Sequence, residues 1–383
     1  MQETFLPFSK PTLSTAEAAE LMECLNSGWL ATGPRVQQFE KMLQEYFSAP
    51  YVLALTSATA GLHLSLLSLD LQPGDEVITT PLTFVATLNT IVQAGGTPVL
   101  VDIDPDTLNF DMQQVADAIT DRTKAIMPVH FAGLPVDLTT LNALALDENL
   151  RVIEDAAHAM GSYYNGMRIG SFGDTQVFSF HPNKNMTTGE GGCVVTRDEV
   201  LAQRIQALRF HGIDRAAWQR NTKTGSQHYD VIAPGFKYNM MDLQAALGIH
   251  QLPQVDNFNH RRQVLAQRYH EILANWPQWE LPLEPAQCPG HAWHIYTPRL
   301  NTDVAGCTRD EFIQQMKDQN IGLGLHYNAV HLYSYYQQQY GWQRGDFPVA
   351  EYVGDHIVSL PLFPQLTEAE QDNVIAAMDK IFN

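Results

Sequence analysis

Short apolar runs that favour β-strands alternate with helical patterns through the first two thirds of the chain. Strands that are apolar on both faces and are separated by helices indicate a mainly parallel sheet that is covered on both sides. We therefore expect a large α/β domain over residues 13–250, beginning with the helix before "GWLATGP". The apolar runs occupy residues 51–56, 76–80, 97–104, 124–131 and 151–157, and a helical pattern follows each of the first four.

The pattern changes beyond residue 250. A long helical stretch, "VDNFNHRRQVLAQRYHEILAN", leads to "AWHIYTPRL", to a second helical stretch, "RDEFIQQMKDQN", and to the loop "GLGLHYNAVH". This order predicts a smaller α+β C-terminal domain over residues 251–383, with the N-terminal segment 1–12 packed on it.

Composition narrows the classes of function. The 383 residues carry a formal net charge of −19, which argues against a general nucleic-acid or anionic-membrane surface. The four cysteines are far apart and form no metal-binding spacing, so we expect reduced thiols, no metal site and a cytoplasmic protein. The first residues lack the pattern of a signal peptide, and no apolar run approaches the ~18 residues of a membrane span.

Candidate chemistry follows the predicted strands, because open parallel sheets bind ligands at the carboxyl ends of their strands. In "TSATAG" (56–61), Ser57 and Thr59 begin a helix, which suits either a phosphate cradle or an ordinary N-cap. Neither a GxGxxG nor a GxxxxGK[ST] motif is present, which argues against a dinucleotide-binding oxidoreductase. In "PLTFVAT" (81–87), Phe84 could stack on a planar ring or pack in the core.

Two further strand ends carry ionisable residues. Glu154 and Asp155 end the apolar run of "VIEDAAHA", where a carboxylate needs a partner or serves as a helix N-cap. Lys184 lies in "HPNKNMTTGEGG", which on composition alone is a surface turn. Pyridoxal phosphate requires a lysine, an acid for its ring nitrogen, a ring contact and a phosphate anchor together. The four segments supply all of them.

Longer motifs resemble one known family. The segments "EDAAHA", "FSFHPNKNMTTGEGG", "SATAGLHL" and "GFKYNMMDLQAALG" resemble the DegT/DnrJ/EryC1/StrS family of nucleotide-sugar aminotransferases. The resemblance extends from "GWLATGP" to "SLPLFPQLT". It implies an aspartate-aminotransferase-like large domain (PLP fold type I), pyridoxal 5'-phosphate as cofactor, and a homodimer with both active sites at the subunit interface.

The same resemblance assigns roles to individual residues. Lys184 would carry the cofactor and Asp155 would pair with its ring nitrogen, so these two are the expected catalytic residues. His158 would lie near the ring hydroxyl, and Phe84 would stack on the ring. The phosphate would be held by Ala58, Thr59 and Ser179, joined by Asn239 of the partner subunit.

Substrate contacts are expected from the small domain and from local cations. By resemblance, the loop "LHYNAVH" closes over the sugar, with His326, Tyr327 and above all His331 as contacts. A diphosphate on so acidic a protein also needs nearby positive charge. The candidates by motif are Lys237, Arg209 and His211.

The substrate is expected to be a nucleotide-linked 4-keto sugar that receives its amino group from L-glutamate at C4. "GWLATGP", "HAWHIY" and "SLPLFPQLT" most resemble the branch that makes UDP-4-amino-4-deoxy-L-arabinose from a UDP-4-keto-pentose for lipid A modification. "HPNKNMTTGEGG" departs from that branch toward the wider family. A UDP- or dTDP-linked 4-keto-6-deoxyhexose therefore stays open as the alternative.

Overall fold

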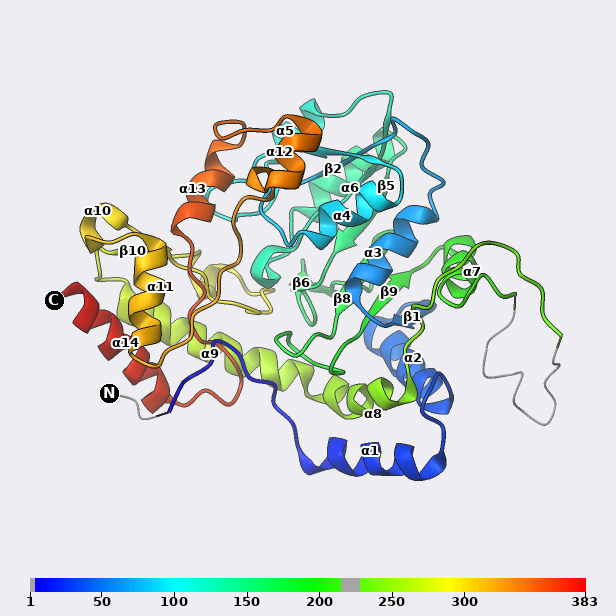
Figure 1. Cartoon of the computed structure of the whole chain (residues 1–383), viewed down its shortest axis with the longest axis horizontal. Helices are drawn as coiled ribbons and strands as arrows, with labels where there is room; N and C mark the ends of the chain where they lie inside the picture. Colours follow the sequence, from blue (N-terminus) through cyan, green and yellow to red (C-terminus); the bar gives the residue numbers. More distant parts are fainter. Residues whose placement is uncertain (1–3, 215–227) are drawn as a thin grey trace.

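Seven strands form one mainly parallel sheet in the computed structural model, which describes residues 4–214 and 228–383. Its order is β1-β9-β8-β5-β4-β2-β3 (Figure 1). Neighbouring strands run parallel except at β9, which is antiparallel to both β1 and β8. The strands are β1 (Tyr51–Leu55), β2 (Glu76–Thr79), β3 (Thr97–Leu100), β4 (Thr123–Ile126), β5 (Arg151–Asp155), β8 (Thr175–Ser179) and β9 (Gly192–Thr196).

Helices cover both faces of this sheet because alternate strand residues point to opposite sides. In β5, Val152 joins one buried cluster and Ile153 the other. The first cluster packs against α2 (Pro34–Phe47), α5 (Met112–Asp117), α6 (Leu138–Asp147) and α8 (Asp242–Gln251). The second packs against α3 (Ala58–Leu67), α4 (Ala86–Gln93) and α7 (Glu199–Leu208). The α/β fold with a mainly parallel sheet that the sequence predicts is therefore confirmed.

Each of the five strands predicted from the apolar runs ends before its run does. The run 124–131 continues past β4, which ends at Ile126, because Pro128 cannot donate a ladder hydrogen bond. In the remainder of the run, Val129 forms an isolated β-bridge with Asp155, and Phe131 begins the short 3-10 helix η1 (Phe131–Gly133). The apolar residues of β9 do not indicate the direction of the strand, so its antiparallel pairing with β1 and β8 was not expected.

A second core lies in the C-terminal part, around the aromatic side chains Trp293 and Tyr296. Leu6 belongs to this core and pairs in parallel with Ile321, so the N-terminal segment packs there. The long helix α9 (Val255–Leu273) connects the two parts and contributes Tyr269. The other elements here are β10 (Trp279–Glu280), β11 (Arg299–Leu300), α10 (Thr302–Ala305), α11 (Arg309–Asp318), α12 (Ser334–Tyr340), α13 (Pro348–His356) and α14 (Glu368–Phe382).

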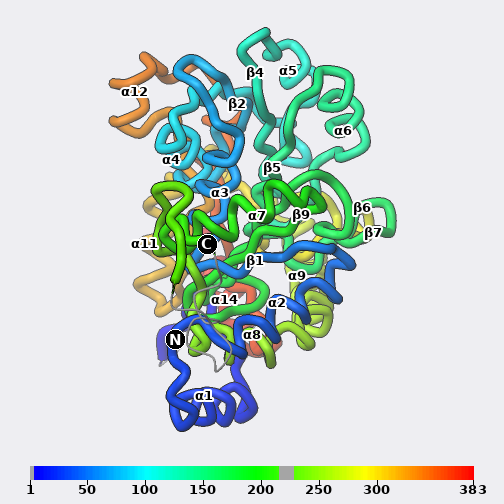
Figure 2. The backbone as a smooth tube through the Cα atoms, turned by 90° about the vertical axis from the view of Figure 1, so that its right-hand side faces the viewer, coloured from blue at the N-terminus to red at the C-terminus, as the bar shows by residue number. Residues whose placement is uncertain are grey.

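A helix and a small hairpin lie at the periphery of the molecule. Helix α1 (Thr15–Ser27) begins with a capping box made by Ser14 and Glu17, and it lies outside α8, at the opposite end of the molecule from α12 (Figure 2). The small hairpin β6 (Tyr163–Tyr164) and β7 (Met167–Arg168) follows the end of β5. Among the described residues, every helix is too short or too polar to cross a membrane.

Candidate active site

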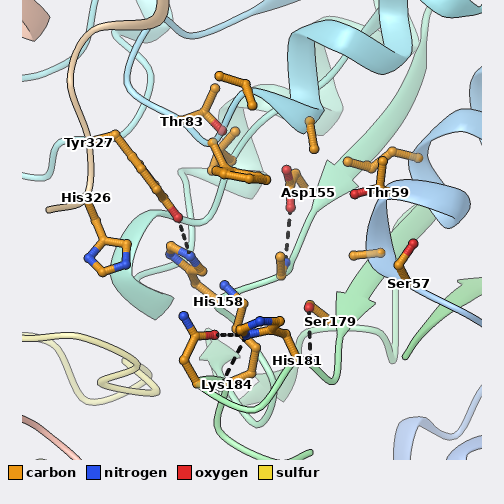
Figure 3. Close-up of a pocket in the computed structure, with 18 of the residues that line it drawn as sticks. Ser57, Thr59, Thr83, Asp155, His158, Ser179, His181, Lys184, His326 and Tyr327 are labelled. Atoms are coloured by element: carbon orange, nitrogen blue, oxygen red, sulfur yellow. Dashed lines mark hydrogen bonds between the residues drawn. The ribbon is translucent and has the colours of Figure 1, made fainter. Parts of the chain in front are cut away.

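A cavity of about 580 Å³ opens at the carboxyl ends of β1, β5 and β8. Figure 3 shows its arrangement: Ser57, Thr59 and Ser179 lie on one side, Tyr327, His326 and His158 on the other, with Asp155 and Lys184 between them. The C-terminal part supplies one wall, through Leu325, His326, Tyr327 and Tyr333. Residues nearly 270 positions apart in sequence thus meet in one site, as the strand-end rule predicts.

The first side is built to hold an anion. Helix α3 begins directly after β1, and the Ser57 hydroxyl accepts a hydrogen bond from the Ala60 N–H (3.1 Å). The N–H groups of Ala58 and Thr59 precede the first intrahelical hydrogen bonds, so they can donate to a ligand. Ser57 therefore caps the helix, while Ala58 and Thr59 line the cavity.

Gly192 allows this cradle to form. It is the first residue of β9 and pairs with Leu55 on one side and with Ser179 on the other. A Cβ atom at this position would lie 2.5 Å from the backbone nitrogen of Ala58. The second glycine of "EGG" therefore lets two strand ends and a helix start approach closely.

Asp155 ends β5 as a buried carboxylate that is 6% exposed. Its Oδ2 accepts a hydrogen bond from the Thr87 hydroxyl (2.8 Å), and its Oδ1 accepts one from the Ala157 N–H (3.2 Å). Thr87 is held in turn by Thr83 (2.8 Å). Burial raises the pKa of Asp155, while the hydrogen bonds from Thr87 and Ala157 and the charge of Lys184 act in the opposite direction. The carboxylate therefore gains from a cationic partner in the cavity.

Lys184 faces the same cavity from a turn between β8 and β9. Burial lowers its pKa to about 8, although the negative charge of Asp155 works in the opposite direction. A lysine with this pKa is half neutral near pH 8, and a neutral amine is a nucleophile and a base.

The turn that carries Lys184 is fixed on both flanks. The Lys184 N–H donates to the His181 carbonyl (2.9 Å). The Asn185 amide donates to the Asn259 side chain (2.6 Å) on α9 and to the Ala292 carbonyl (2.8 Å). Met186 is buried in the core of the large sheet. This segment is therefore an anchored wall of the cavity and not a free surface turn.

The opposite side of the cavity is aromatic. The Tyr327 hydroxyl lies 3.0 Å from His158 Nε2, and His326 Nδ1 lies 2.8 Å from the Ser359 hydroxyl. Burial lowers the pKa of His158 and His326, the latter to about 3, so both rings are neutral. Phe84 lines the cavity with 56% of its surface exposed, which suits a ring-stacking contact better than a core role.

Three of the expected contacts do not line this cavity. His331 is fully buried and pairs with Glu351 (2.9 Å), so the structure gives it a place inside the C-terminal part instead of the expected contact with substrate. Asn239 pairs with Leu55 in a β-bridge, and its side chain accepts a hydrogen bond from Lys237 Nζ (3.0 Å). Both Asn239 and Lys237 lie outside the cavity lining.

The other cationic candidates are also placed elsewhere. Arg209 is buried, with its guanidinium bonded to Glu40 (2.5 Å) and to the Ala54 carbonyl (3.0 Å), so it is not available to a diphosphate. His211 is exposed and does not line the cavity. Closeness in sequence to the "GFKYN" segment therefore does not place these cationic side chains beside the cavity.

Sequence reasoning missed several residues that shape the site. Thr87 lies in the same segment as Phe84, "PLTFVAT", and its hydroxyl orients Asp155. The Ala132 N–H donates to His158 Nδ1 (3.3 Å) from a backbone with φ of 57°. Tyr333 lines the cavity. Apart from the threonines of "PLTFVAT", no local motif announced these contacts.

The donor set fits pyridoxal phosphate. A helix N-terminus with hydroxyls suits the phosphate, the buried Asp155 suits a protonated ring nitrogen, and Lys184 has the lowered pKa that a covalent attachment needs. These three groups surround one cavity, with Phe84 beside it.

Comparisons with known proteins agree with this fit. The model of the DegT/DnrJ/EryC1/StrS aminotransferase family matches residues 11–379. The chain is 44% identical over 381 residues to the uncharacterized protein MJ1066 of Methanocaldococcus jannaschii, covering 100% of this chain and 98% of that protein. It is 45% identical over 378 residues to the spore coat polysaccharide biosynthesis protein SpsC of Bacillus subtilis, covering 98% and 97%. The putative sugar aminotransferase Spr1654 from Streptococcus pneumoniae, in its PLP-form, is similar in structure, with a TM-score of 0.89 and 31% identity over 99% of this chain and 100% of the other.

Proposed function

Because this chain belongs to the DegT/DnrJ/EryC1/StrS aminotransferase family, we propose that it transfers an amino group from L-glutamate to C4 of a nucleotide-linked 4-keto sugar. Family membership makes it a sugar aminotransferase that depends on pyridoxal 5'-phosphate. The single observation that carries the proposal is the meeting of Lys184, Asp155 and the α3 cradle around one cavity.

Asp155 and Lys184 have different roles in the proposed reaction. Bound pyridoxal phosphate supplies an electron sink for the electron pair left on the donor's α-carbon. Asp155 keeps the ring nitrogen protonated, because an opposite charge at short range raises such a pKa by about 1–3 units. Lys184 holds the cofactor and, once its amine is free, moves a proton from the donor's α-carbon to the adjacent cofactor carbon. The same residues serve a second half-reaction on the keto sugar, so the kinetics should be ping-pong.

The rate of cofactor attachment should depend on the protonation of Lys184. Its amine reacts when neutral, so the attachment rate of the cofactor-free protein should rise with pH through a midpoint near 8, well below the ordinary value of about 10.4 for lysine. Stopped-flow absorbance in the visible range measures this rate. Because the charge of Asp155 raises the pKa of Lys184, Asp155→Asn should move the midpoint to lower pH. A midpoint above pH 10 would contradict the assignment.

We propose that a partner subunit contributes to the binding of the cofactor phosphate. We propose a homodimer in which Asn239 of each chain reaches the other cavity, since it lies beside the β1 end yet outside its own cavity lining. Lys237 donates a hydrogen bond to the Asn239 side chain and would bring positive charge to the same place. His326 and Tyr327 line the cavity and are the proposed contacts on the small-domain side.

For the sugar, we propose a UDP-4-keto-pentose, which would place the enzyme in lipid A modification in the cytoplasm. The four unpaired cysteines are in keeping with a reducing compartment. The alternative is a UDP- or dTDP-linked 4-keto-6-deoxyhexose for a surface polysaccharide. The likeness to a spore coat polysaccharide biosynthesis protein favours this alternative.

A panel of UDP- and dTDP-linked 4-keto sugars tests the proposal. Each sugar is incubated with the protein, pyridoxal phosphate and L-glutamate, and the product mass and the position of the new amine are determined. We expect one amino group at C4 of a UDP-linked pentose. Turnover of 6-deoxyhexoses alone would replace the pentose by the alternative, and turnover of no nucleotide sugar would overturn the proposed function.

A further inference from the structure

The geometry points to Tyr327 as a hydrogen-bond donor to the 3-oxygen of the cofactor ring, with His158 and the backbone of Ala132 fixing the direction of that hydrogen. This inference rests on the proposed function and deepens it. It makes Tyr327 a contact of the cofactor instead of the expected contact of the sugar, and it makes His158 a positioning residue that acts through Tyr327.

The direction is set first at Ala132. Its N–H donates to His158 Nδ1 at 3.3 Å, and a backbone N–H can only donate. Ala132 has a φ of 57°, in the left-handed region that residues with a side chain seldom occupy. Its carbonyl accepts the N–H of His294 (2.9 Å), and the next carbonyl, of Gly133, accepts that of Ala292 (3.0 Å). The two hydrogen bonds to segment 292–294 hold this backbone in place.

The proton of His158 is then assigned by elimination. The ring is 5% exposed, and burial together with the positive charge of Lys184 keeps its pKa well below the usual value, so the ring is neutral. A neutral imidazole has one N–H, and Nδ1 is already an acceptor, so the hydrogen is on Nε2. Nε2 lies 3.0 Å from the Tyr327 hydroxyl and therefore donates to it.

The hydroxyl hydrogen of Tyr327 is available to an acceptor in the cavity. Its oxygen accepts from His158, and among the described residues no acceptor is recorded for its own hydrogen. Burial raises the pKa of Tyr327, and the charge of Asp155 raises it further, so the hydroxyl stays protonated. Tyr327 lines the cavity beside His158 (Figure 3), so rotation of the hydroxyl can direct this hydrogen into the cavity.

The shape of the cofactor identifies the acceptor atom. In pyridoxal phosphate the ring nitrogen, the phosphate arm, the carbon that reacts with lysine and the 3-oxygen occupy different ring positions. With the nitrogen at Asp155, the phosphate at the α3 cradle and the reactive carbon at Lys184, the 3-oxygen would face the side opposite the cradle. Figure 3 shows Tyr327 and His158 on that side. A negatively charged ring oxygen there is the acceptor that a fixed hydroxyl donor stabilises.

The titratable groups around this pair leave the assignment unchanged. The rings of His294 and His158 are tilted by 48° with centroids 4.3 Å apart, and His326 lies 5.0 Å from Tyr327 by the same measure. Burial lowers the pKa of both histidines, so neither adds positive charge near neutral pH. Asp155 and Lys184 are the charged groups, and in the complex each is engaged by the cofactor.

Tyr327→Phe in the cofactor-bound protein tests the inference by spectroscopy. The donor stabilises negative charge on the 3-oxygen and so weakens its hold on the proton of the neighbouring nitrogen that joins Lys184 to the cofactor. Without the donor, the pKa of that nitrogen should rise by about 1–2 pH units, since a hydrogen bond to a charged group has this magnitude. A pH titration of the visible absorbance, in the absence of substrate, measures the shift.

Matched variants separate this role from a general disturbance. Tyr333→Phe removes a hydroxyl from the same cavity and should leave the titration unchanged. His158→Gln can accept from Ala132 and donate to Tyr327, so it should titrate near the unsubstituted protein, whereas His158→Leu should shift part of the way toward Tyr327→Phe. If Tyr327→Phe fails to fold, the two His158 variants supply the same comparison.

Two results would overturn the inference. One is an unchanged titration in both Tyr327→Phe and His158→Leu. The other is a Tyr327→Phe variant whose only defect is a raised KM for the keto sugar, which would return Tyr327 to the substrate. An unsubstituted protein without a visible band, or without a borohydride adduct at Lys184, would instead remove the proposed function on which the inference rests.

Discussion

Replacing Lys184 by alanine should abolish transamination and remove the site of borohydride labelling. The variant loses both the covalent attachment and the proton-transfer group, so the turnover rate should fall by at least about 10⁴-fold. Tryptic peptides of the borohydride-treated protein, analysed by mass spectrometry, should carry the label on the peptide with Lys184 in the unsubstituted protein and on none in the variant.

The variant should remain folded, because burial disfavours the charged form of this lysine by more than the charge of Asp155 favours it. Thermal unfolding checks this directly. Lys41→Ala is the matched control, since the Lys41 side chain is 77% exposed on α2 and lies far from the cavity lining. Residual turnover by Lys184→Ala at more than a small fraction of the control rate would contradict the assignment of Lys184.

Replacing Asp155 by asparagine should lower the rate of the glutamate half-reaction by about 10²–10³-fold. Asparagine matches the shape of the side chain but carries no charge, so the ring nitrogen loses the partner that raises its pKa by about 1–3 units. Single-turnover absorbance with L-glutamate alone isolates this half-reaction. Thr87→Val removes one hydrogen bond and leaves the charge, so its loss should be much smaller, about 10-fold.

A cofactor with a methyl group on the ring nitrogen distinguishes the electrostatic role of Asp155 from a structural one. That nitrogen is permanently positive and needs no carboxylate to stay so. Asp155→Asn loaded with this analogue should recover part of the lost rate, while the unsubstituted protein should gain nothing from it. If the analogue rescued neither the rate nor the spectrum, Asp155 would be a structural residue at the end of β5.

The sequence indicated the centre of the site better than its edges. Asp155 and Lys184 follow apolar runs whose carboxyl ends must meet at one sheet edge, so strand order alone brings them together. His331 lies in the short 3-10 helix η5 (Val330–Leu332), where no periodicity shows which histidine faces the ligand, and its partner Glu351 lies 20 residues further on. Arg209 was misjudged for the same reason, since its partner Glu40 is 169 residues away.

Backbone conformation limited the prediction elsewhere. Ala132 occupies the left-handed region although alanine shows no preference for it, so no residue type announced the turn that directs His158. The direction of β9 is likewise set by its neighbours β1 and β8 and leaves no mark in its own apolar pattern. Motif spacing therefore located the reacting groups, and long-range contacts that it does not encode supplied their orientation.

The cradle at the start of α3 has a consequence for redesign. The affinity of the cradle for a phosphate would depend on main-chain N–H groups, which every non-proline residue offers. Exchanging the side chains of Ala58 or Thr59 is therefore a poor means of adjusting that affinity. The sensitive position is in another strand: Gly192 sets how closely β9 approaches the backbone of Ala58. An engineer seeking a scaffold with weaker or stronger retention of its prosthetic group would leave the cradle alone and vary the spacing behind it.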